Sequence, residues 1–107
     1  MKKNIIINLQ YEAIHSWQSC NMAEVAFLKH PHRHIFCICC KKEVEHNERE
    51  IEIIMFKRLI LDYLVKEFKG DFKNMSCESL AERLLKDFEL SYCSVLEDGE
   101  NGAEVTQ

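Results

Sequence analysis

The sequence predicts an α+β fold in which two strands precede two helices and two short strands follow. Residues 4–14 and 32–45 alternate between apolar and polar side chains, which is typical of strands with one buried face. Between residues 53 and 88, apolar side chains instead recur at helical spacing. Two short strand-like segments, residues 91–96 and 103–106, complete the order ββααββ.

Length and composition favour one soluble domain that spans residues 1–107. The hydrophobic fraction is 47%, and the net charge is −4 with scattered lysines and arginines, which argues against a nucleic-acid groove. No apolar run is long enough to span a membrane, and the three isoleucines near the N-terminus are too few for a signal peptide. We therefore expect a cytoplasmic protein whose six cysteines are reduced thiols.

The first predicted strand is rich in isoleucine and leads to His15. Residues 16–31 follow as a long connection that carries Trp17, Cys20 and Phe27. Connections of this length are often functional, so we expect this loop to lie near a site. Trp17 and Phe27 could stack on a ring-shaped ligand or could simply hold the loop against the sheet.

Three histidines, His30, His32 and His34, open the second predicted strand. Residues two apart on a strand share a face, so His32 and His34 can reach the same metal ion. Antiparallel pairing of the first two strands could bring His15 beside them. Three imidazoles with an open position are typical of a catalytic or ligand-binding zinc site. The alternative is a polar edge strand with solvated imidazoles.

The same strand contains a C-x-x-C pattern formed by Cys37 and Cys40. Residues three apart on a strand face opposite sides, so this pair cannot chelate one ion while the strand is regular. We therefore expect both thiols to pack within the sheet.

Two helices are predicted in the middle of the chain. The spacing of Ile53, Phe56 and Ile60 indicates the first helix, and Gly70 provides its end. Ser76 is a suitable N-cap for the second helix, whose apolar stripe includes Leu84. After the third strand, residues 98–102 form a glycine-containing hairpin loop.

These motifs, in this order, resemble the tunnelling-fold (T-fold) family of the 6-pyruvoyl-tetrahydropterin synthases and the 6-carboxytetrahydropterin synthases of queuosine biosynthesis. Ala13-Ile14-His15 matches the family's Ala-x-His, and His32-Arg33-His34 matches its His-x-His. Met75-Ser76-Cys77-Glu78 occupies the place of its Pro-Thr-Ser-Glu motif. Val95-Leu96-Glu97 matches the end of its third strand, where a glutamate anchors the pterin ring.

The resemblance implies a four-stranded antiparallel sheet with two helices packed on one face. It also implies an oligomeric barrel, built as a trimer or hexamer, and zinc held by His15, His32 and His34. Glu97 would bind a pterin or purine nucleotide, because a carboxylate can accept hydrogen bonds from two adjacent N–H groups.

The sequence also departs from this family. The family's catalytic cysteine lies a few residues before the His-x-His motif, whereas here the cysteine of that loop, Cys20, lies twelve positions before His32. The aspartate–histidine pair after the first helix is replaced by residues 61–66, which contain no histidine.

Three interpretations follow. The first is a synthase-like lyase in which the Cys20 thiol or a water molecule moves protons. The second is a non-catalytic T-fold protein of a viral or mobile-element kind that binds or sequesters a nucleotide. The third is a small α+β protein whose histidines bind nothing.

Overall fold

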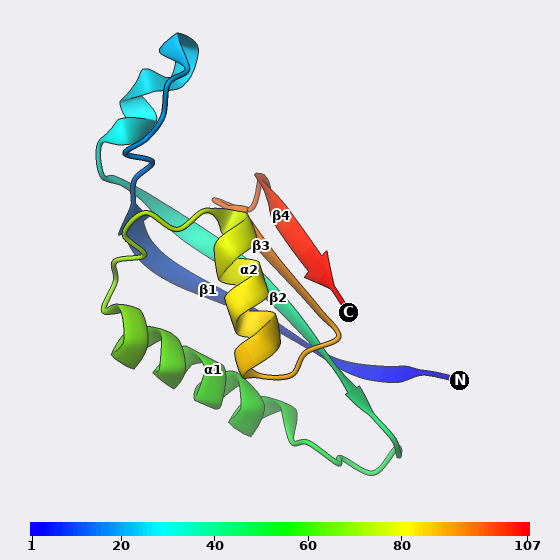
Figure 1. The fold of residues 1–107 in the computed structure, drawn as a ribbon. Coiled ribbons are helices and arrows are strands. Elements are labelled where there is room, and N and C mark those ends of the chain that lie inside the picture. The colour runs from blue at the N-terminus through cyan, green and yellow to red at the C-terminus, as the bar shows by residue number, and fades with distance from the viewer.

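The computed structural model describes residues 1–107 and contains one four-stranded antiparallel sheet with the strand order β1-β2-β3-β4 (Figure 1). The elements are β1 (Lys3–His15), η1 (Ala23–Lys29), β2 (His32–Val44), α1 (Ile53–Phe68), α2 (Cys77–Asp87), β3 (Tyr92–Glu97) and β4 (Asn101–Thr106). The ββααββ order agrees with the sequence prediction. The 3₁₀ segment η1 was not predicted, and it lies in the part of the long connection that projects beyond the sheet in Figure 1.

The long β1–β2 ladder determines which residues meet at each end of the sheet. Lys3 pairs with Val44 at one end, and His15 pairs with His32 at the other. Because the ladder has no offset in between, every odd-numbered residue of β1 lies opposite an even-numbered residue of β2. The last residue of β1 and the first residue of β2 are therefore direct neighbours.

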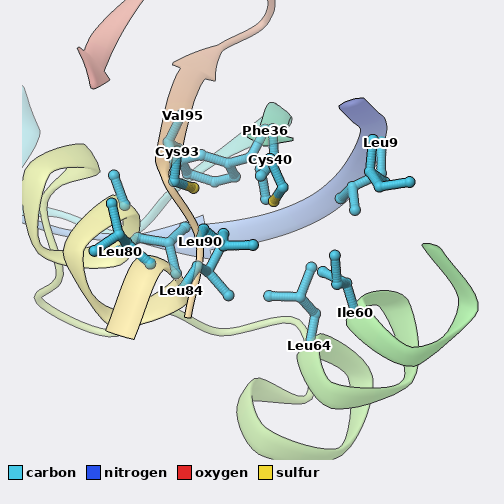
Figure 2. Packing of buried hydrophobic residues seen from close by; sticks show 14 of the residues in the cluster. Leu9, Phe36, Cys40, Ile60, Leu64, Leu80, Leu84, Leu90, Cys93 and Val95 are labelled. Atoms are coloured by element: carbon cyan, nitrogen blue, oxygen red, sulfur yellow. The ribbon is translucent and has the colours of Figure 1, made fainter. Parts of the chain in front are cut away.

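Both helices cover the same face of the sheet, as Figure 1 shows, and the core lies between these layers. In Figure 2, Leu9 and Phe36 from the strands point toward the helices, which contribute Ile60, Leu64 and Leu84. The C-x-x-C pair divides between the two faces as predicted. Its second thiol, at position 40, is fully buried, whereas the first, at position 37, is half-buried on the helix-free face.

Side chains and backbone conformation fix the limits of the helices. Glu52 caps α1, where its carboxylate accepts hydrogen bonds from the backbone N–H groups of Ile54 and Met55, both at 3.0 Å. These bonds lower the pKa of the Glu52 carboxyl. The left-handed turn after α1 starts at Lys69 (φ 53°), one residue before the predicted Gly70. None of the helices is both long and apolar enough to cross a lipid bilayer.

The connection between the helices is attached to the end of β1. Ile14 N–H donates to the carbonyl of Gly70 at 2.9 Å, and its own carbonyl accepts from the N–H of Phe72 at 2.9 Å. Ser16 N–H continues this pairing to the carbonyl of Lys73 at 2.8 Å. As a result, the start of α2 lies beside the histidine that ends β1.

Candidate metal centre

Three histidines and one carboxylate meet at one end of the sheet, on the face that the helices cover. His15 ends β1, His32 begins β2, and Glu97 ends β3. His34 lies two residues into β2, opposite Ala13 of β1. The alternation that buries the core side chains therefore continues into these four residues at the ends of their strands.

The four side chains are close enough to share one ion. The ring centres of His15 and His32 lie 4.5 Å apart, and that of His34 lies 5.4 Å from His15 and 5.1 Å from His32. One potential ligand atom from each histidine and from Glu97 lies within 4.8 Å of the other three. Ligand atoms around a tetrahedral zinc are roughly 3–4 Å apart, so small side-chain adjustments would complete such a site.

Each imidazole is held through its Nδ1 atom by an oxygen. His15 Nδ1 donates to the carbonyl of Met75 at 3.0 Å, and His32 Nδ1 donates to the carbonyl of His30 at 2.8 Å. His34 Nδ1 donates to Oδ2 of Asp98 at 2.7 Å. Because these oxygens only accept, Nδ1 carries the hydrogen, and Nε2 of a neutral ring is left with its lone pair. Histidines that bind metals are commonly oriented in this way.

Two of these Nε2 atoms have no hydrogen-bond partner although they are buried. They belong to His15 and His34. Glu97 Oε2 lies 2.9 Å from His15 Nε2, which is ion-pair distance for a protonated ring, but the contact does not meet hydrogen-bond geometry. A lone pair and a carboxylate at this distance repel each other unless a proton or a metal ion lies between them. The cluster therefore fits a divalent metal ion, and its donors, imidazole and carboxylate, are both ligands of zinc.

A hollow of about 380 Å³ opens beside this cluster. His15, His32 and Glu97 form part of its wall. The β1–β2 connection contributes Trp17, and the start of α2 contributes Cys77 and further residues. This hollow would hold a small molecule whose edge reaches the histidine cluster.

From the sequence, Glu97 is predicted to anchor a bound ring. In the structure its carboxylate lies in the histidine cluster, with one oxygen 2.9 Å from His15 Nε2 and the other 3.7 Å from His34 Nε2. Because β3 pairs with β2 so that Glu97 lies opposite Phe36, the carboxylate reaches the histidines directly. Glu97 also lines the hollow, so it can contact either a metal ion or a bound molecule.

Cys20 does not line the hollow. Its side chain is buried inside the β1–β2 connection, where Sγ lies 3.8 Å from the carbonyl of Met22 and 3.7 Å from that of Val25. Its catalytic role stays a prediction, and this position does not favour it.

The thiol that does line the hollow is that of Cys77, the first residue of α2, which the sequence analysis treated only as part of a helix start. Burial, followed by the nearby Glu97 carboxylate, raises the pKa of the Cys77 thiol to about 12. Cys77 is therefore protonated at neutral pH.

Asp98 is a second residue that the sequence analysis did not connect with the site, since it was assigned only to the hairpin loop. Its carboxylate accepts from the N–H of Ile35 as well as from His34, and these two hydrogen bonds, in that order of importance, lower the pKa of the Asp98 carboxyl. Metal-binding histidines usually donate to an oxygen atom through their second ring nitrogen, and only this general rule could have suggested Asp98 from the sequence.

Comparisons with known proteins do not assign the chain to a family. No protein-family model matches its sequence, and no curated protein matches it. The residues themselves and their geometry indicate a metal centre, since four ligand atoms lie within reach of one ion and two of them are buried nitrogens without a hydrogen bond.

Proposed function

We propose that this protein binds a divalent metal ion, with zinc as the first candidate, and holds a pterin or purine ring beside it. The observation that carries the proposal is the pair of buried Nε2 atoms, of His15 and His34, that have no hydrogen-bond partner and lie next to the Glu97 carboxylate. Leaving a buried polar atom unpaired costs about 1–3 kcal/mol. A metal ion at this point would remove that cost and balance the negative charge.

Metal analysis of the purified protein tests the first part. After incubation with zinc and removal of unbound ions, we expect about one equivalent per chain, and cobalt substitution should give an absorption spectrum typical of tetrahedral coordination. The variant His32→Ala should lose the bound metal, whereas His46→Ala, at an exposed histidine in the turn after β2, should retain it. Wild-type protein that retains no metal would contradict the proposal.

The ring ligand is inferred from the hollow and from the resemblance to the tetrahydropterin synthases. Two carboxylates, Glu97 and Glu78, lie in the wall of the hollow, and that wall contains no lysine or arginine. This wall suits an uncharged ring rich in N–H groups, and a phosphate attached to such a ring would have to lie outside the hollow. Pterins and guanines offer an N–H beside an exocyclic NH₂, which one carboxylate can bind with two hydrogen bonds. Trp17 provides an aromatic surface in the same wall.

Two glutamine variants separate the possible roles of the carboxylates. If Glu97 anchors the ring, as the resemblance implies, Glu97→Gln should retain zinc and lose the rise in melting temperature that a pterin or guanosine produces. If Glu97 is instead the fourth metal ligand, the same variant should bind zinc more weakly, and Glu78→Gln should lose the ring. A screen in which no pterin or purine raises the melting temperature of the zinc-loaded wild type would contradict the ring-binding proposal.

Two candidate functions share this site. In a synthase-like lyase, zinc would polarise oxygen atoms of the substrate side chain, and a thiol or a water molecule would move protons. In a non-catalytic protein that binds or sequesters a nucleotide, the ring would be held unchanged. The position of Cys20 outside the hollow favours the second candidate.

Incubation of the zinc-loaded protein with dihydroneopterin triphosphate discriminates between these candidates. Product formation that is lost in His32→Ala would establish the lyase. A rise in melting temperature without turnover would establish the binding protein.

We also propose that subunits associate through their sheet edges, as the resemblance to T-fold barrels implies. The outer edge of β4 is unpaired, and the outer edge of β1 is paired only near its end, where Ile14 bonds to the connection between the helices. The helix-free face exposes Ile6, Ile14 and Ile35. Open edges beside exposed apolar side chains favour association. Light scattering should give the mass of a trimer or hexamer, and a monomer at micromolar concentration would contradict this proposal.

A further inference from the structure

We propose that Asp98 is a positioning residue that holds the His34 ring in the tautomer able to bind a metal ion. The proposal rests on the proposed function, because it assigns Asp98 a role in the same metal centre. It rests on a separate observation, a hydrogen bond at Nδ1 of His34, on the opposite side of the ring from Nε2.

Asp98 is attached to β2 at three points next to His34. Its Oδ2 atom accepts from His34 Nδ1 at 2.7 Å, and its Oδ1 atom accepts from the backbone N–H of Ile35 at 2.9 Å. Its own backbone N–H donates to the carbonyl of Ile35 at 2.8 Å. The carboxylate therefore cannot rotate away from His34 without losing the bond to Ile35 as well.

The turn between β3 and β4 positions this carboxylate beside His34. Asp98 and Gly99 both have left-handed backbone conformations, with φ values of 55° and 73°, and Glu100 N–H donates to the carbonyl of Glu97 at 3.0 Å. This is a β-turn over residues 97–100, within the three-residue connection between the paired Glu97 and Asn101. Aspartate tolerates the left-handed region better than most residues, because its short side chain makes local hydrogen bonds. The same residue can thus form the turn and support the histidine.

His34 is the member of the histidine cluster whose support is a side chain. His15 and His32 are held by the backbone carbonyls of Met75 and His30, which no substitution removes. Asp98 is also the one charged group among these three acceptors, and a carboxylate behind an imidazole makes its Nε2 a stronger metal ligand. A change at position 98 should therefore act on the metal through His34 alone.

Asparagine at position 98 would satisfy only half of this arrangement. Two donors, His34 Nδ1–H and Ile35 N–H, share the two oxygens of the carboxylate, whereas an amide has one oxygen. If that oxygen stays with Ile35, the NH₂ group faces His34 Nδ1. Nδ1 must then accept, and the ring hydrogen moves to Nε2, where it blocks the metal ion.

The experiment compares wild type with Asp98→Asn and Asp98→Gly, because both replacements fit a left-handed turn and should fold. Asp62→Asn is the matched control, since Asp62 lies on the surface of α1 in an ion pair with Lys66. The tautomer of His34 is read from ¹⁵N chemical shifts of the metal-free protein, with the His34 signals assigned by their loss in His34→Gln. Zinc affinity is measured by competition with a chelator.

In wild type and in Asp62→Asn, we expect the ring hydrogen of His34 on Nδ1. In both Asp98 variants the population with the hydrogen on Nε2 should rise, and zinc affinity should fall by about 10- to 100-fold. Wild-type tautomer and wild-type affinity in both variants would overturn the proposal.

The tautomer measurement needs no metal, so the two proposals can fail separately. Wild-type protein without zinc affinity would contradict the metal centre. In that case a shift of the ring hydrogen in the Asp98 variants would still support the role of Asp98 toward His34, and an unchanged tautomer would still overturn it.

Discussion

Two regions on the helix-covered face of the sheet are built by the same strands and have opposite character. In the middle, Leu9, Ile38 and Val95 pack against the helices with nearly no exposed surface. At the end, the same alternation presents His15 and His34, whose buried Nε2 atoms have no hydrogen-bond partner. The strand pattern that produces the core therefore also produces the site, where ligand-forming side chains replace apolar ones at the last positions.

Phe36 forms the boundary between these regions. Its ring packs edge-on against His15, with ring centres 5.1 Å apart, and against His34, with ring centres 5.7 Å apart. On its other side it packs against Phe72 at 4.9 Å. The middle region should therefore determine stability, and the end region should determine metal binding.

The largest effect on stability is expected in the middle region. Leu84→Ala removes a fully buried side chain, so it should lower the free energy of unfolding of the metal-free protein by about 2–5 kcal/mol. Leu59→Ala, at an exposed leucine of α1, should change it by about 0.5 kcal/mol or less. Urea denaturation measures both values. Equal effects of the two variants would remove the basis for the division.

The end region should show the reverse behaviour. His15→Ala should weaken zinc binding by more than the roughly 100-fold effect typical of a residue that only supports a ligand. In the metal-free protein, the loss of the hydrogen bond to Met75 should cost about 1 kcal/mol. Titration calorimetry and urea denaturation report the two quantities. A large loss of stability without a loss of affinity would assign His15 to the core instead.

Metal binding at the end region should raise the stability of the whole fold, the middle region included. Free zinc at about 100 times its dissociation constant should add about 2.7 kcal/mol to the free energy of unfolding, because the ion binds the folded state. A chelator should remove this gain. The gain should persist in Leu84→Ala and be absent in His15→Ala, and thermal melting with and without zinc checks both. A gain in His15→Ala would place the ion elsewhere.

The smallest effect concerns the cap of α1, which lies outside both regions. Since the pKa of Glu52 is lowered in the folded protein, its stabilising contribution is present above the ordinary carboxyl value of 4.5 and is lost as the pH falls through the lower folded value. The melting temperature of the metal-free Glu52→Gln variant should therefore depend less on pH, between about pH 5 and pH 3, than the melting temperature of the wild type.

Glu24→Gln, at an exposed glutamate of the β1–β2 connection, is the control for the cap and should behave like wild type. A Glu52→Gln variant with the same pH dependence as wild type would show that the cap makes no contribution linked to the carboxylate.

Local patterns were sufficient to predict the element order and the histidine cluster. The two-residue period of a strand puts His32 and His34 on one face, and pairing of consecutive strands brings His15 to them. The segment η1 was missed because the apolar residues of 16–31 follow neither the two-residue period of a strand nor the period of a helix. Asp98 was missed because a left-handed turn brings it to the site. Cys77 was missed because it reaches the site only when the connection between the helices pairs with the end of β1. Contacts of this kind depend on tertiary packing and leave no periodic signal in the sequence.

The attachment of the α1–α2 connection to the end of β1 has a consequence for biosynthesis. The carbonyl of Met75 orients His15, and the carboxylates of Glu97 and Asp98 arrive only with the third and fourth strands. A nascent chain on the ribosome therefore exposes its histidines well before it can complete the centre. Capture of an ion should report that the whole domain has folded, and incomplete chains should not retain one.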